Sequence, residues 1–131
     1  MQTKLFKDEY PIYTMTLKKS ETTMPNISAV ILHFQTKIQE HPVATYIGIF
    51  DHFRHTSSLS DGVIAPEILD AQNVLCCFGK NLENAEVMAV RPRSIGIVER
   101  QDEYVISFLK APNPAANDAM VTWTKALADK K

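Results

Sequence analysis

The chain lacks the features that mark membrane proteins, secreted proteins and nucleic-acid-binding proteins. None of its apolar runs approaches the roughly 20 residues that a membrane span requires. The N-terminal run MQTKLFKDEY has no continuous apolar segment of the kind found in secretion signals. The formal net charge is −1, so no overall field favours nucleic acid or an anionic lipid surface. We therefore expect a cytoplasmic protein that binds neither nucleic acid nor membrane.

Cysteine is scarce: Cys76 and Cys77 are the only two in the chain. Neighbouring side chains on a strand point to opposite faces, so these two thiols cannot form an ordinary disulfide with each other. Cofactor and catalytic signatures are missing too: the sequence contains no glycine-rich phosphate loop, paired CxxC, HExxH or GxSxG. The sequence thus predicts reduced thiols and no cofactor, and it leaves open whether the protein is an enzyme.

The hydrophobic pattern, by contrast, predicts the fold in some detail. Runs typical of strands occupy five segments: Tyr10–Lys19, Ala44–Phe53, Val74–Phe78, Ile95–Val98 and Tyr104–Leu109. A helix is predicted from Ile27 to His41, after an N-cap at Asn26, and a second helix from Pro114, capped by Asn113. A polar loop is predicted at His55–Gly62, and a short helical turn is predicted at Pro66–Ala71.

This order predicts a single α+β domain over residues 1–131, a two-layer sandwich with the order β-α-β-β-β-β-α. We expect one antiparallel sheet with both main helices on one face. The residues predicted to join the two layers are Ile31, Phe34, Met120 and Trp123.

Two of the predicted strands are apolar on both faces, which suggests that both faces are covered. In the last strand, Val105 and Leu109 alternate with Tyr104, Ile106 and Phe108. We expect a homodimer that buries the face carrying Tyr104, Ile106 and Phe108. The alternative is a monomer whose second face is covered by the segment Thr56–Asp70.

The densest polar cluster is Asp51–His55. Two imidazoles three residues apart, His52 and His55, can bind a divalent metal if the strand ends at Phe53. The commoner interpretation is a strand end with solvated side chains, so no metal site is predicted and these two remain weak candidates. A Cys76 or Cys77 thiol facing His52 would form a nucleophile and base, but cysteines in an apolar strand are more often small core residues.

Arg91-Pro92-Arg93 places two guanidinium groups on one side of a stiffened, extended segment. Such a pair can hold a carboxylate or phosphate, and the alternative is salt bridges to Glu83, Glu86 or Glu99. The leading prediction is a non-catalytic binding or sensing domain for a small anion, held by Arg91 and Arg93 near His52. The alternatives are a small metal- or thiol-dependent enzyme and a structural homodimeric interaction module.

Several short motifs together resemble a known family. They are Ile49–His52, Val74–Asn81, Val87-Met88 and an apolar hairpin that ends near Ala111-Pro112. In these motifs the chain resembles the small bacterial proteins called domain of unknown function three-hundred-and-two, over about residues 27–128. The chain departs from that pattern at Lys80-Asn81 and Ala85-Glu86, so a separate, related uncharacterised family is the alternative. The resemblance implies a TBP-like fold with the order derived above, and it implies no reaction.

Overall fold

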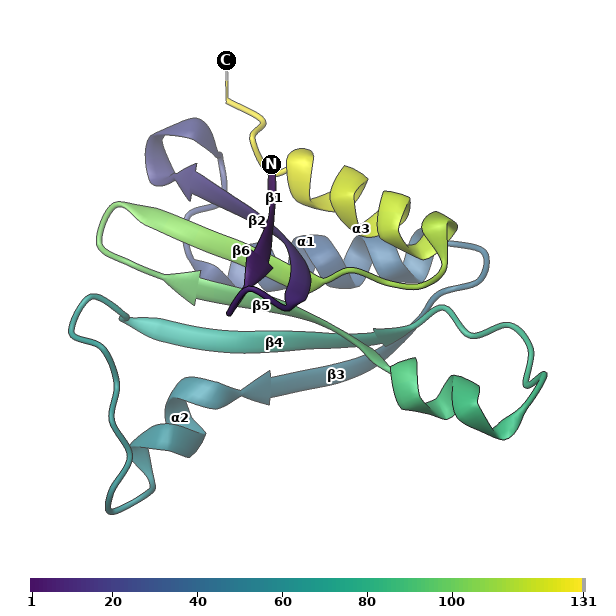
Figure 1. Cartoon of the computed structure of the whole chain (residues 1–131). Coiled ribbons are helices and arrows are strands. Elements are labelled where there is room, and N and C mark those ends of the chain that lie inside the picture. Colours follow the sequence, from purple (N-terminus) through teal and green to yellow (C-terminus); the bar gives the residue numbers. More distant parts are fainter. Residues whose placement is uncertain (131) are drawn as a thin grey trace.

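The computed structural model describes residues 1–130 and contains one six-stranded antiparallel sheet with helices packed on it (Figure 1). The strands are β1 (Gln2–Phe6), β2 (Tyr10–Lys18), β3 (Thr45–Asp51), β4 (Asp70–Cys77), β5 (Arg93–Glu99) and β6 (Glu103–Leu109). The helices are α1 (Ile27–Glu40), α2 (His52–Ser57) and α3 (Pro114–Lys125), with 3-10 turns η1 (Lys19–Glu21) and η2 (Ala85–Val90). The sheet order is β1-β2-β6-β5-β4-β3. The predicted α+β class is confirmed.

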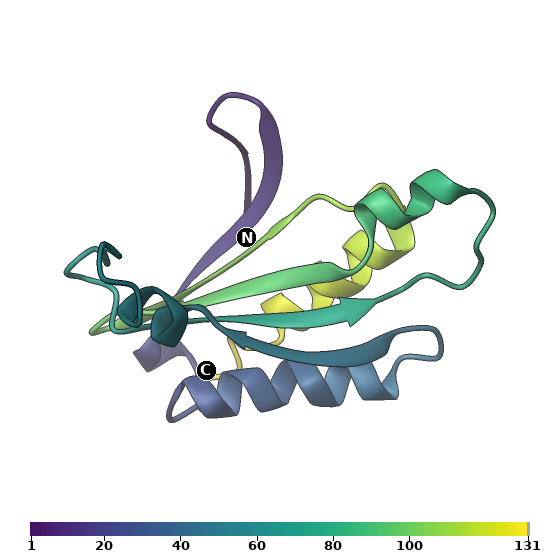
Figure 2. The same cartoon turned by 90° about the horizontal axis from the view of Figure 1, so that it is seen from below.

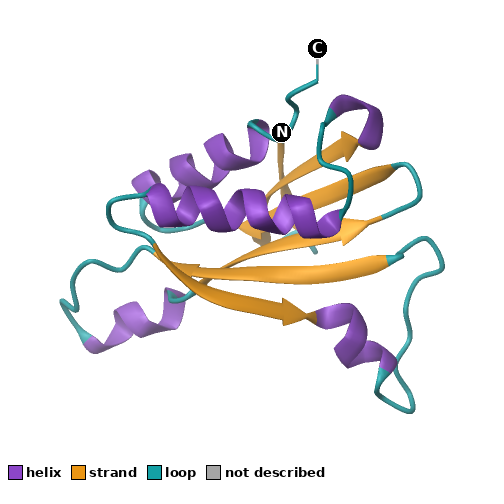
Figure 3. Cartoon of the chain, turned by 180° about the vertical axis from the view of Figure 1, so that it is seen from behind, coloured by secondary structure: helices purple, strands orange, loops and turns teal. Residues whose placement is uncertain are grey.

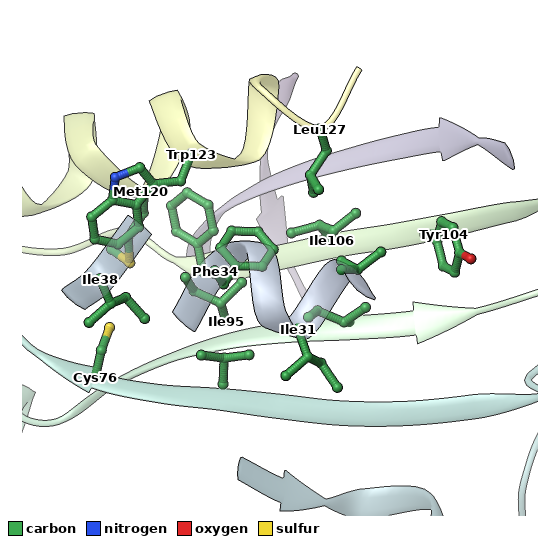
Figure 4. Packing of buried hydrophobic residues seen from close by; sticks show 14 of the residues in the cluster. Ile31, Phe34, Ile38, Cys76, Ile95, Tyr104, Ile106, Met120, Trp123 and Leu127 are labelled. Atoms are coloured by element: carbon green, nitrogen blue, oxygen red, sulfur yellow. The ribbon is translucent and has the colours of Figure 1, made fainter. Parts of the chain in front are cut away.

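The two main helices, α1 and α3, lie side by side on one face of the sheet (Figure 3). All four residues predicted to join the layers, Ile31, Phe34, Met120 and Trp123, are buried in one hydrophobic core (Figure 4). The sheet contributes alternate residues to this core, among them Ile95 on β5 and the other inward-facing side chains of β4 and β6. The two-layer arrangement is therefore confirmed.

Local capping explains where these helices begin. The Asn26 side chain accepts a hydrogen bond from the Ala29 N–H at 2.9 Å, which satisfies one free donor of the first turn of α1. At α3, Asn113 accepts from the Ala115 N–H at 3.0 Å and Pro114 occupies the first helical position. Both predicted N-caps are confirmed.

The prediction that the face carrying Tyr104, Ile106 and Phe108 forms a dimer interface is wrong. Tyr104, Ile106 and Phe108 are all buried, and they belong to the core that α1 and α3 cover. Their neighbours in register on β2 include Leu17 and Met15, which also face the helices or pack on the core. Because β6 is apolar on both faces, the sequence alone could not show which face the helices cover. The helices, and not the segment Thr56–Asp70, cover the face that carries these three residues. A homodimer stays a prediction with no interface assigned.

Other differences lie where side chains are exposed or polar. β1 was not predicted, and its five residues are all exposed. The hairpin β1–β2 rises away from the sheet on the side opposite α1 (Figure 2). The strand predicted to reach Phe53 ends at Asp51, whose carboxylate accepts from the Arg54 N–H at 3.0 Å and starts α2. Residues predicted as a loop after His55 thus begin inside a helix. The helical turn predicted at Pro66–Ala71 is shorter in the structure: a single turn at Pro66-Glu67, in which the Ile68 N–H donates to the Ala65 carbonyl at 3.0 Å, is followed by β4 from Asp70.

A candidate anion-binding pocket

A cavity of about 170 Å³ lies at one end of the sheet, where β4 ends, β5 begins and α3 starts. Its walls are mostly apolar and include Phe78, Val87, Val90, Ala111, Pro112 and Ala116. The two arginines singled out from the sequence, Arg91 and Arg93, both line it. The prediction that the Arg91 and Arg93 side chains lie on the same side of the segment is consistent with their both lining this cavity.

Arg93 is the first residue of β5 and its side chain lies on the core side of the sheet, opposite Cys76 of β4. Only 9 % of the residue is exposed. Its guanidinium donates to the Val90 carbonyl at 3.4 Å and to the Leu109 carbonyl. Within residues 1–130 the buried Nε has no hydrogen-bond partner, and no carboxylate lies within salt-bridge distance of Arg93. Burial lowers the pKa of Arg93, but a guanidinium remains charged in proteins.

Arg91 approaches the cavity from the end of η2. Its Nη1 donates to the Asn81 carbonyl at 2.7 Å, which ties the loop after β4 to the start of β5. The guanidinium lies over Gly79, because a Cβ built at Gly79 would come 2.7 Å from Cζ and Nε of Arg91. Gly79 therefore leaves the space that the Arg91 side chain occupies. Sequence reasoning missed this glycine.

The salt bridges suggested as the alternative for these arginines do not form in the described part of the chain. Glu99 pairs instead with Lys19, at 2.7 Å. Glu83 and Glu86 are exposed and form no salt bridge within residues 1–130. The positive charge of Arg93 is thus left without a protein counter-ion among these residues.

The N-terminus of α3 forms a third side of the cavity, through Asn113 and Ala116. The first N–H groups of a helix have no partner within the helix and carry a partial positive charge. The sequence signal for this feature was available, since Asn113-Pro114 predicted the helix start. What the sequence did not show was that this start lies beside Arg93.

His52 does not belong to this pocket. Across the sheet, Tyr46 of β3 is level with Cys76, and Cys76 is level with Arg93. Asp51, the last residue of β3, lies five residues beyond Tyr46, or roughly 17 Å at the usual rise of a strand, and His52 follows it. Figure 1 shows α2, which starts at His52, at the opposite end of the sheet from the turn η2. The predicted grouping of His52 with the arginines is wrong, because it required β3 to run the other way.

His52 instead bonds within its own helix. Its Nδ1 lies 3.0 Å from the Thr56 hydroxyl, and its ring packs against Phe50 and His55. Within residues 1–130 no group of three or more His, Cys, Asp or Glu side chains could hold a metal ion. The pairing of His52 with a cysteine thiol is wrong as well, because Cys76 and Cys77 are in register with the start of β3, whereas His52 follows its end.

The two thiols should react at very different rates. Burial raises the pKa of Cys76 to about 11, whereas Cys77 is only partly buried. We expect a thiol reagent such as DTNB at pH 8 to modify Cys77 in the folded protein and to reach Cys76 only after unfolding. Counting the thiols released with and without denaturant measures this. Rapid labelling of a folded Cys77→Ser variant would contradict it.

Comparison with known proteins gives a family but no activity. The model of a family described as "Family of unknown function (DUF6858)" matches residues 1–129. No curated protein and no solved structure matches the chain. In the described residues 1–130, no helix has both the length and the apolar character needed to cross a membrane.

The family suggested by the sequence motifs is therefore not the one that matches, although the expectation of an uncharacterised family is confirmed. The TBP-like assignment depended on that resemblance and stays a prediction. Nearly the whole chain is covered by the match, so the protein belongs to the family of unknown function DUF6858.

Proposed function

We propose that this protein is a non-catalytic binding or sensing domain whose cavity holds a small anion between Arg93, Arg91 and the start of α3. The observation that carries the proposal is Arg93, a buried arginine with no carboxylate partner in residues 1–130. Taking one charge out of water costs several kcal/mol unless an opposite charge or enough hydrogen bonds offset it. Two backbone carbonyls accept from Arg93, which leaves donors of the guanidinium free for a ligand.

The surroundings of the cavity support an anion rather than a cation. Arg91 and the N-terminus of α3 add positive potential from two further sides. None of the described residues that line the cavity is acidic. Each of these features has the same sign, so an anion would interact favourably with all of them.

Binding is also favoured over catalysis. None of the described lining residues is a serine, cysteine, histidine, lysine, tyrosine or carboxylate, the usual nucleophiles and general bases. The thiol-dependent form of the enzyme alternative required His52 beside Cys76 or Cys77, and both cysteines pair with the start of β3, at the other end of that strand from His52. Arginines and backbone N–H groups orient and hold an anion without taking part in bond making.

The test is a panel of small anions, namely acetate, benzoate and inorganic phosphate, measured by thermal unfolding and by amide NMR. At least one should raise the unfolding temperature and shift the Ala116 amide signal, because an anion that binds only the folded state stabilises it. In Arg93→Gln these effects should disappear. The matched control is Arg100→Gln, which removes the same charge from the β5–β6 turn, where Arg100 pairs with Glu103, and should leave anion binding unchanged.

A second variant keeps the test valid if Arg93→Gln folds poorly. Gly79→Ala adds a single methyl group whose carbon would overlap the guanidinium of Arg91. Because a flexible side chain can move aside, this variant should fold normally and bind the anion several-fold more weakly. If no anion in the panel affects the protein, or if both variants bind like the unchanged chain, the proposal is overturned.

A further inference from the structure

Building on the proposed function, we infer that the anion is a small monocarboxylate with an apolar body, and not a phosphate or a phosphate ester. Three observations carry this inference: the small number of free N–H groups at α3, the charge balance of the two arginines, and the size and lining of the cavity.

The N-terminus of α3 has few donors to offer. Pro114 has no N–H, the N–H of Ala115 is used by the Asn113 side chain, and the N–H of Asn117 is used by the Asn113 carbonyl at 3.1 Å. Within residues 1–130 this leaves the N–H of Ala116, a residue that lines the cavity. Phosphate sites at helix N-termini use several backbone N–H groups at once. One N–H is enough for a carboxylate oxygen and too few for a phosphoryl group.

The charge balance favours a single negative charge. Arg93 is buried, whereas Arg91 is partly exposed and already donates to the Asn81 carbonyl. One carboxylate would neutralise the one cation that is removed from water. A guanidinium can hold a carboxylate in two parallel hydrogen bonds, and the two carbonyls that accept from Arg93 leave some of its N–H groups free for such a ligand.

The cavity walls favour an apolar body on that carboxylate. A volume of about 170 Å³ is similar to the roughly 150 Å³ of an engineered apolar cavity that accepts benzene. Phe78 forms a fixed wall, because its ring is stacked on Trp123 at a centroid distance of 5.6 Å and meets the edge of His41. Val87 and Val90 complete an apolar surface beside the arginines. A flat or branched body of about six to nine non-hydrogen atoms fits this space.

Isothermal titration with four probes tests the inference: benzoate, the uncharged benzamide, acetate and phenyl phosphate. Benzoate should bind most tightly. Benzamide should bind about 30-fold more weakly or worse, because it leaves the buried cation without a counter-charge. Acetate should bind about tenfold more weakly, since it lacks the apolar body, and phenyl phosphate should bind more weakly than benzoate. In Val87→Thr, which keeps the shape of the side chain, affinity for benzoate should fall several-fold and affinity for acetate should not change.

The outcomes separate this inference from the proposed function. Tighter binding of phenyl phosphate than benzoate, lost in Arg93→Gln, would overturn the carboxylate and leave anion binding standing. Acetate binding as tightly as benzoate would overturn the apolar body alone. Benzamide binding as tightly as benzoate would overturn both proposals. No binding by any of the four probes would overturn the carboxylate, and would overturn anion binding as well if inorganic phosphate also has no effect.

Discussion

Replacement of Phe34 by alanine should lower the free energy of unfolding by about 3–5 kcal/mol, the largest effect that we expect from any single substitution in this chain. Phe34 is fully buried near the middle of α1 and lies in the core between the helices and the sheet (Figure 4). Removal of the ring would leave a cavity that the closely packed neighbours can fill only in part. Urea unfolding, followed by circular dichroism and extrapolated to water, measures the change.

Leu32→Ala is the matched control, because Leu32 lies two residues away on the same helix and is 59 % exposed. It should change the free energy of unfolding by less than about 0.5 kcal/mol. Equal losses in the two variants would show that the Phe34 ring packs no more closely than the exposed Leu32 side chain, and that α1 does not pack on the sheet as described.

Replacement of Asn117 by leucine should lower the free energy of unfolding by about 1–3 kcal/mol, although leucine is the more hydrophobic residue. Asn117 is buried at 5 % exposure, and its side-chain oxygen accepts from the Ala111 N–H at 2.8 Å. This bond holds the turn between β6 and α3. Leucine would leave a buried N–H without an acceptor. Because Ala111 and Ala116 line the cavity, the variant should also bind benzoate more weakly.

Asp118→Ala serves as the control for Asn117, since Asp118 is the next residue on α3 and is exposed. Its effect on the free energy of unfolding should stay within about 0.5 kcal/mol. The account of Asn117 is contradicted if the leucine variant is as stable as the unchanged protein, or if it loses stability without any change in benzoate affinity.

Much of the fold could be predicted from the sequence because its signals are local. Helix starts at Asn26 and Asn113 are marked by capping residues, and the strands in the second half of the chain are separated by turn residues. β1 gave no such signal, since all of its residues are exposed and no burial pattern marks it. The orientation of β6 was also hidden, because a strand that is apolar on both faces does not indicate which face the helices cover.

The candidate site likewise contains residues that a local sequence pattern could predict and residues that it could not. Arg91 and Arg93 are two residues apart, so their convergence on one cavity could be expected from a short extended segment. Gly79 and Ala116 reach the same cavity through strand pairing and through the turn into α3, which no local pattern reveals. The error on His52 has the same origin. The sequence shows a histidine close to the end of a strand, but the pairing of β3 with β4 decides at which end of the sheet that histidine lies.

The sheet order β1-β2-β6-β5-β4-β3 also bears on how the chain can assemble during its synthesis. β3, β4, β5 and β6 pair in sequence order, so each new strand finds its neighbour already made. β2 is synthesised early but pairs with β6, with Lys18 opposite Glu103. Until the ribosome has released β6, the only partner of β2 in the sheet is β1. On the nascent chain, β2 can therefore pair with β6 only after nearly the whole protein has been synthesised. Of all the strand pairings in the sheet, β2 with β6 joins the residues most distant in sequence, so its formation costs the most chain entropy.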